Sequence, residues 1–179
     1  GMGRTGKLYA MEHFGVQADI VTTAKGIASG MPIAAFVASD KVMTWPEGAH
    51  GSTYGGNPVA VAAASKTLDL LQGGLTAHAA DVGAYFMDKL KALQSKHADS
   101  IGDVRGLGLM IGMEFTKVEN GRIVADAAKR DAFIQKAFEK GLLTLACGNS
   151  TVRFCPPLVI SKSDIDIAYD IISDVVSAL

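Results

Sequence analysis

The 179-residue sequence predicts an α/β protein in two parts. Residues 1–74 are expected to be the end of a larger sheet domain, and residues 75–179 a small α+β domain. Three observations predict this arrangement: two short apolar runs typical of buried strands lie in the first part, helical periodicity begins near residue 75, and a glycine pair separates the two patterns. The first 74 residues hold too little periodic structure to close a core alone.

The first part contains two expected strands and one expected helix. Residues 18–24 form a β-branched run. Residues 33–39 are apolar on both alternating faces, which is typical of a strand in a parallel or a mixed sheet. After a loop of turn-forming residues, Pro58 stands where the first turn of a helix is expected. Gly73 and Gly74 are expected to end that helix.

The second part alternates helices and strands. Apolar residues at helical spacing predict an amphipathic helix over 75–97. Further along, the pattern predicts strands with glycine kinks over 103–116, a helix over 126–141, and a strand, turn and strand over 142–158. A C-terminal helix is expected to bury Ala168, Ile171, Ile172, Val175, Val176 and Leu179.

Composition excludes several classes of function. The chain carries 17 basic and 18 acidic side chains, so it has no basic footprint for nucleic acid or an anionic membrane. No apolar run approaches the ~20 residues of a membrane helix, and no secretory leader is recognised. Cys147 and Cys155 form no C-x-x-C pair, which favours a reducing, cytoplasmic setting. The four histidines show no metal-ligand spacing, so no metal site is expected.

The opening GMGRTGK matches the spacing of a phosphate-binding P-loop, G-x-x-x-x-G-K. That loop requires a buried strand before it and a Ser or Thr after the lysine to hold Mg²⁺. No strand precedes the motif here, and Leu8 occupies the hydroxyl position. The P-loop interpretation therefore fails, and the glycines need another explanation.

Lys25 is the sharpest chemical feature of the sequence. It follows a β-branched strand and is flanked by small residues, AKGIASG. A lysine there projects from the carboxyl end of a strand, where open α/β sheets bind their ligands. Taken alone, a solvated lysine at a strand end is the simpler interpretation.

The motifs that surround Lys25 favour a functional role for it over a solvated surface lysine. DIVTTAKGIASGMP, HGSTYGGNP, VRGLGLMIGMEF, KGLL and VRFCPPLVIS follow one another in the order in which similar segments occur in one family. The sequence resembles the class III aminotransferases, the pyridoxal-phosphate enzymes of the ornithine, acetylornithine and 4-aminobutyrate group. The likeness covers nearly the whole chain, and it implies a fold type I transferase. Gly1, Gly3 and Gly6 then resemble the glycine-rich connection that leads to the lysine strand.

The resemblance assigns roles to four residues. Lys25 would form the Schiff base with pyridoxal phosphate and then act as the general base. Thr53, with Ser52 ranked lower, would contact the cofactor phosphate; in the family that threonine comes from the neighbouring subunit, which implies a homodimer. Arg153 would grip the substrate carboxylate. Arg105, in VRGLG, is interpreted as structural.

The resemblance also defines what this chain does not match. The family's acidic partner of the pyridine nitrogen and its phosphate-cradling loop lie upstream of the segment matched by residue 1. We therefore expect a C-terminal fragment of an enzyme that is incomplete for catalysis alone. The expected reaction moves an amino group from an amine or ω-amino acid, with 4-aminobutyrate favoured, to a 2-oxo acid such as 2-oxoglutarate. An aminomutase, racemase or decarboxylase of the same fold, and a non-catalytic remnant, stay open as alternatives.

Overall fold

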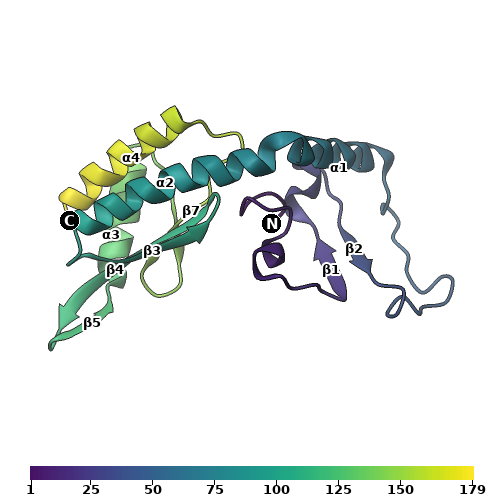
Figure 1. The fold of residues 1–179 in the computed structure, drawn as a ribbon, viewed down its shortest axis with the longest axis horizontal. Coiled ribbons are helices and arrows are strands. Elements are labelled where there is room, and N and C mark those ends of the chain that lie inside the picture. Colours follow the sequence, from purple (N-terminus) through teal and green to yellow (C-terminus); the bar gives the residue numbers. More distant parts are fainter.

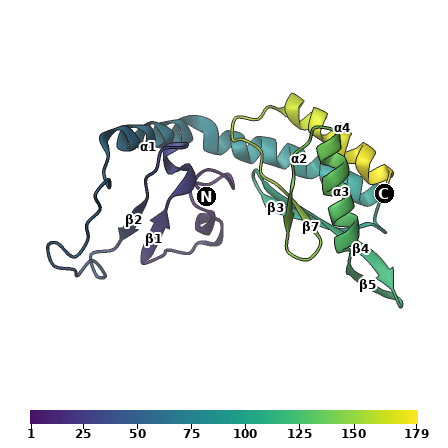
Figure 2. The ribbon, with the colours of Figure 1, turned by 180° about the vertical axis from the view of Figure 1, so that it is seen from behind.

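A computed structural model describes residues 1–179, whose elements fall into two groups (Figure 1). The first group comprises η1 (Ala10–Phe14), β1 (Ile20–Thr23), η2 (Lys25–Ala28), β2 (Ala35–Ala38) and α1 (Pro58–Leu70). The second comprises α2 (Thr76–Lys96), β3 (Ile101–Leu107), β4 (Met110–Glu119), β5 (Arg122–Ala125), α3 (Ala127–Glu139), β6 (Leu145–Cys147), β7 (Thr151–Phe154) and α4 (Lys162–Ser177). Seen from behind, the β1–β2 pair lies near α1, and the larger sheet lies near α2 (Figure 2). None of these helices is both long and apolar enough to cross a membrane.

The junction between α1 and α2 differs from the prediction. The glycine pair does not end the helix; a π-helical turn, η3 (Leu71–Leu75), joins the two helices directly. Gly74 alone leaves helical geometry, with φ 138, a value that glycine adopts readily because it has no Cβ. The glycines therefore kink the helix where a stop was expected. The division of the chain into two domains at residue 74 stays a prediction.

Strands β1 and β2 pair antiparallel, with Ile20 opposite Ala38 and Thr23 opposite Ala35. Of the two predicted alternatives, a parallel pairing is therefore wrong for these strands. The connection between them, residues 24–34, falls just below the dozen or more residues that a parallel crossover needs. The strands are also not buried as expected: their residues alternate between exposed and half-buried, because no second layer covers the pair.

The second group encloses the main hydrophobic core. Its five-stranded antiparallel sheet has the order β3-β4-β7-β6, with β5 paired to β4. Alternate strand residues, among them Val104, Met113 and Val152, are buried with apolar residues of α2, α3 and α4. The amphipathic helix predicted over 75–97 is confirmed as α2. The strand residues that alternate with these belong to the opposite face of the sheet, which we call the outer face.

The C-terminal helix α4 is also confirmed, but Ala168 and Ile171 of its predicted buried set are only half-buried. Ile172, Val175 and Val176 are buried as expected. Leu179 is 38% exposed, because α4 ends at Ser177 and the last residues leave the helical stripe.

The glycine-rich start is a packing surface. A Cβ on Gly108, in the β3–β4 turn, would lie 2.5 Å from the carbonyl carbon of Thr5. A Cβ on Gly6 would lie 2.8 Å from that of Ala80 in α2. The absence of side chains therefore lets the N-terminal segment lie against the second group, which explains these glycines without a nucleotide.

Candidate functional site

Lys25 lies at the carboxyl end of β1, as predicted. It is the first residue of η2, its backbone has φ 52, and its side chain is exposed. This left-handed conformation costs an ordinary residue about 1 kcal/mol, and such strain clusters at functional sites. Immediately before it, Ala24 and the threonines of β1 line a cavity of about 480 Å³.

A second cavity, of about 380 Å³, lies against the loop that carries Ser52 and Tyr54. The two cavities share Ala34 and His50 in their walls. His50 also packs edge-on against the rings of Phe36 and Trp45, with centroid distances of 5.9 and 5.8 Å. The structure thus brings the end of the lysine strand and the Ser52 loop together around His50.

Ser52 and Thr53 occupy exposed positions in that loop. The Ser52 Oγ accepts a hydrogen bond of 3.0 Å from the Gly55 N–H, so Ser52 stabilises the turn itself. Just beyond, the Asn57 side chain caps the first turn of α1. Thr53 is therefore left with an exposed hydroxyl beside a turn that its neighbour holds in place.

Arg153 lies in the other group of elements, on β7. It lines a mostly apolar cavity of about 450 Å³ together with Thr144 and Phe86. The Nε of Arg153 and the Oγ1 of Thr144 are both buried and have no hydrogen-bond partner. Buried polar atoms are almost always paired, so these two are exceptions inside the protein.

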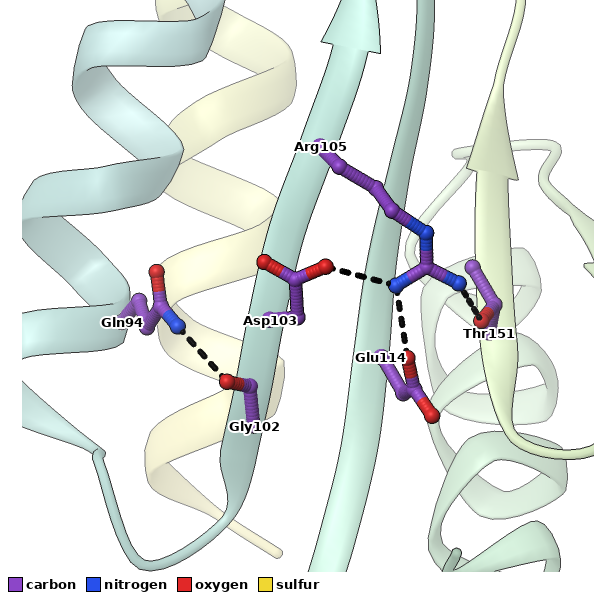
Figure 3. A network of polar contacts seen from close by, with 6 residues as sticks. All are labelled: Gln94, Gly102, Asp103, Arg105, Glu114 and Thr151. Atoms are coloured by element: carbon purple, nitrogen blue, oxygen red, sulfur yellow. Dashed lines mark hydrogen bonds and ion pairs between the residues drawn. The ribbon is translucent and has the colours of Figure 1, made fainter.

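Arg105 forms a polar network on the outer face (Figure 3). Its Nη1 donates to Asp103 Oδ2 at 2.9 Å and to Glu114 Oε2 at 2.6 Å, and its Nη2 donates to Thr151 Oγ1 at 3.3 Å. Hydrogen bonds to Asp103 and then Glu114 raise the pKa of the Arg105 guanidinium above its ordinary value. These contacts agree with a structural interpretation of Arg105. In the same view the Gln94 amide of α2 donates to the Gly102 carbonyl of β3.

The four predicted residues are not all brought together. Ser52 lines a cavity that shares walls with the one beside Lys25, whereas Arg153 lines a separate cavity in the other group of elements. Sequence reasoning missed His50 and Thr144. The position of His50 directly before GST was an available signal, but nothing in the sequence distinguishes Thr144.

The residues present fit a phosphorylated aldehyde cofactor. Lys25 offers an exposed amine at a strained strand end, next to a cavity lined by hydroxyl and small side chains. The exposed loop of Ser52 and Thr53 offers a hydroxyl and backbone N–H groups, which suit an oxyanion of a cofactor in the neighbouring subunit.

Comparison with known proteins places this geometry in context. The family model described as Aminotransferase class-III matches residues 1–176. The acetylornithine aminotransferase of Caldanaerobacter subterraneus subsp. tengcongensis is 39% identical over 180 residues, covering 100% of this chain and 43% of that protein. The LysW-aminoadipate semialdehyde transaminase of Deinococcus radiodurans is 46% identical over 168 residues, covering 93% of this chain and 36% of that protein.

Solved structures give the same result. The crystal structure of acetylornithine aminotransferase from Elizabethkingia anophelis matches with a TM-score of 0.86 at 33% identity, covering 100% of this chain and 44% of that one. The matches confirm the predicted fold class, fold type I. The chain spans less than half the length of the relatives it resembles.

Proposed function

The chain belongs to the class-III aminotransferase family, and on that premise we propose that the protein transfers an amino group from an ω-amino acid to a 2-oxo acid. Class III aminotransferases use pyridoxal phosphate. When bound, this group acts as an electron sink for the substrate carbon that loses its proton. The protein supplies the residues that bind and orient the reactants and move that proton.

Each predicted residue has a defined role in this proposal. Lys25 holds the cofactor through its ε-amine and, once displaced by the amino substrate, moves the proton at the substrate carbon. Thr53, from the partner subunit of a homodimer, donates its hydroxyl to the phosphate, with Ser52 holding the turn. Arg153 binds the carboxylate of the 2-oxo acid, because a planar guanidinium suits two parallel hydrogen bonds.

The position of Lys25 carries the proposal. It lies inside the segment that the family model matches, at the end of β1, in a left-handed backbone conformation. Ser29 and Asn120 also have a positive φ, so this conformation supports the proposal together with the position of Lys25 at the strand end and its family match. A lysine that must present its amine to a bound cofactor gains from a fixed backbone.

The donor is a second part of the proposal. The names of the similar proteins favour N-acetylornithine or a related semialdehyde-forming amine. The motifs MEHFGV and LLTLACGNSTVRF favour 4-aminobutyrate. All of these donors carry a primary amine on an unbranched chain that ends in a carboxylate. We take N-acetylornithine as the first donor to test and 4-aminobutyrate as the second.

An acceptor-dependence assay tests this function. The whole gene product containing these residues is supplied with pyridoxal phosphate, 2-oxoglutarate and each donor, and glutamate is measured. We expect glutamate formation that requires both donor and 2-oxoglutarate and that disappears in Lys25→Ala. Donor consumption without any 2-oxo acid would instead identify a mutase or decarboxylase. A folded protein that neither consumes donor nor binds pyridoxal phosphate would identify a non-catalytic remnant.

A further inference from the structure

Arg105 and Arg153 lie in one row across the sheet. Gly112 of β4 is paired with Arg105 of β3 on one side and with Arg153 of β7 on the other. Side chains of residues directly opposite one another emerge on the same face of a sheet. The two arginines therefore emerge on the outer face, on either side of a residue that has no side chain.

Glu114 occupies the adjacent row, between the two arginines. It is paired with Asp103 of β3 and with Thr151 of β7, so both arginines are its diagonal neighbours. Diagonal neighbours lie about 7–8 Å apart at the backbone, which long side chains span. The register thus allows the Glu114 carboxylate to pair with either guanidinium.

The structure contains one of these two pairings. Glu114 Oε2 accepts from Arg105 Nη1 at 2.6 Å, and Asp103 Oδ2 accepts from the same nitrogen at 2.9 Å. No ion pair involves Arg153, and its Nε is buried without a partner. Of the two carboxylates that pair with Arg105, Glu114 is the one that neighbours Arg153 in the sheet register, and Arg105 holds it.

We propose that Arg105 is a positioning residue that holds Glu114 away from Arg153 and so keeps Arg153 available to a substrate carboxylate. The consequence for substrate binding rests on the proposed function, in which Arg153 binds the 2-oxo acid. Without Arg105, Glu114 would face Asp103 directly opposite it, and like charges so placed repel. Arg153 is then the remaining cation among the neighbours of Glu114 in the sheet register.

The local geometry suits an arginine at position 105. The planar guanidinium donates hydrogen bonds from Nη1 to the carboxylates of Asp103 and Glu114 and from Nη2 to the hydroxyl of Thr151. The path to Thr151 passes Gly112, where a Cβ would lie 2.9 Å from Thr151 Cγ2. A lysine has no second nitrogen with which to reach Thr151 while it holds the carboxylates.

The first experiment needs no substrate. The side-chain N–H signals of Arg153 are recorded by ¹⁵N NMR in the 179-residue chain and in three variants: Arg105→Gln, Arg105→Gln with Glu114→Gln, and Lys117→Gln. Lys117 is the matched control, because it pairs with Glu119 on the same sheet at 3.5 Å. We expect the Arg153 signals to shift in Arg105→Gln, to return in the double variant, and not to change in Lys117→Gln.

A second measurement follows the consequence for binding. Titration with 2-oxoglutarate is expected to give about two- to five-fold weaker affinity in Arg105→Gln, the range of one exposed ion pair. The double variant is expected to recover the original affinity, and Arg105→Lys to recover part of it. A structural role for Arg105 would predict weaker binding that Glu114→Gln does not repair.

The outcomes separate the two proposals. Unchanged Arg153 signals in Arg105→Gln, or signals that shift and fail to return in the double variant, would overturn the assignment of Arg105. If the Arg153 signals behave as expected but the whole gene product and its Arg153→Gln variant bind 2-oxoglutarate with equal affinity, the assignment of Arg105 stands and the proposed role of Arg153 is lost.

Discussion

The Nε of Arg153 and the hydroxyl of Thr144 are buried and have no partner in the protein. Leaving a buried polar group unpaired costs stability, about 1–3 kcal/mol for each group. Single substitutions at these residues can measure that cost and can test the proposed role of Arg153.

Replacing Thr144 with valine is expected to stabilise the unliganded protein by about 1 kcal/mol, since it removes an unpaired buried hydroxyl. Thr151→Val is the matched control. Its Oγ1 accepts from Arg105, so this change is expected to destabilise the protein. Urea denaturation measures both free energies of unfolding. A loss of stability in Thr144→Val equal to that in Thr151→Val would mean that the Thr144 hydroxyl is paired in solution.

Replacing Arg153 with lysine is expected to weaken 2-oxoglutarate binding about ten-fold, because the ammonium loses the parallel pair of charge-assisted hydrogen bonds. Arg122→Lys, on the exposed strand β5, serves as the control and should bind normally. Isothermal titration gives both dissociation constants. Equal affinity in the two variants would remove Arg153 from the proposed site.

At the scale of elements, close backbone contacts and a charged cluster join helices to their neighbours. Helix α2 approaches the β3–β4 turn so closely that a Cβ on Gly83 would lie 2.2 Å from the Gly108 carbonyl carbon. On its other side, Lys89 of α2 lies over the rings of Tyr85 and Tyr169 and pairs with Asp166 of α4 at 2.8 Å. The Gly83–Gly108 contact and the Lys89–Asp166 ion pair each lead to a testable prediction.

Gly83→Ala is expected to destabilise the protein by about 1–3 kcal/mol, despite alanine's higher helix propensity, because the new methyl group overlaps the β3–β4 turn. Gly73→Ala makes the same chemical change where no atom lies within 4 Å of the new Cβ. That control should be neutral or stabilising. Thermal unfolding compares the two. Similar midpoints would show that α2 and the turn are further apart than described.

The α2–α4 pairing predicts a pH dependence. Hydrogen bonds from Lys89 and then Tyr85 lower the pKa of Asp166 below its ordinary value. A lowered carboxyl pKa contributes stability that is present above the ordinary pKa and is lost as the pH falls through the folded-state pKa. The contribution should therefore be present at neutral pH and disappear below about pH 4.

Comparing the stability of the unmodified protein with that of Asp166→Asn across this range tests the prediction. The difference should be largest near neutral pH and shrink in acid. A difference that is independent of pH would show that the Asp166 carboxylate does not stabilise the α2–α4 contact.

At the scale of the whole molecule, the two groups of elements differ in how well they are buried. The second group has a closed core of 19 buried residues, whereas a second cluster, in the first group, has 3. Large apolar side chains of the first group, including Phe14, Val37 and Tyr54, are exposed. Exposed apolar surface of this extent is typical of an interaction surface.

We therefore expect the chain to self-associate at micromolar concentration. Multi-angle light scattering should show a mass above that of a single copy. A variant with Val37→Lys and Val59→Lys, both at exposed positions, should shift the chain toward the monomer. A monomer at every concentration would contradict the prediction.

The sequence predicted most elements of the second group, because helical periodicity over α2 and α4 reflects a core that lies inside this chain. Prediction from the sequence failed for features that depend on the three-dimensional geometry of the backbone. Whether Gly73 and Gly74 stop or kink a helix depends on one backbone angle, and the register that places Glu114 between two arginines depends on pairing across three strands. Lys25 was recognisable from the motif around it, whereas the unpaired hydroxyl of Thr144 is a property of the folded cavity.

The most direct test of the central claim is whether Lys25 holds pyridoxal phosphate. The chain is titrated with pyridoxal phosphate, reduced with borohydride, and digested for peptide mass mapping, with Lys25→Ala and the exposed Lys41→Ala as the paired variants. We predict one phosphopyridoxyl adduct, on Lys25, which is absent in Lys25→Ala and retained in Lys41→Ala. No adduct, or adducts spread over surface lysines such as Lys41 and Lys66, would contradict the account.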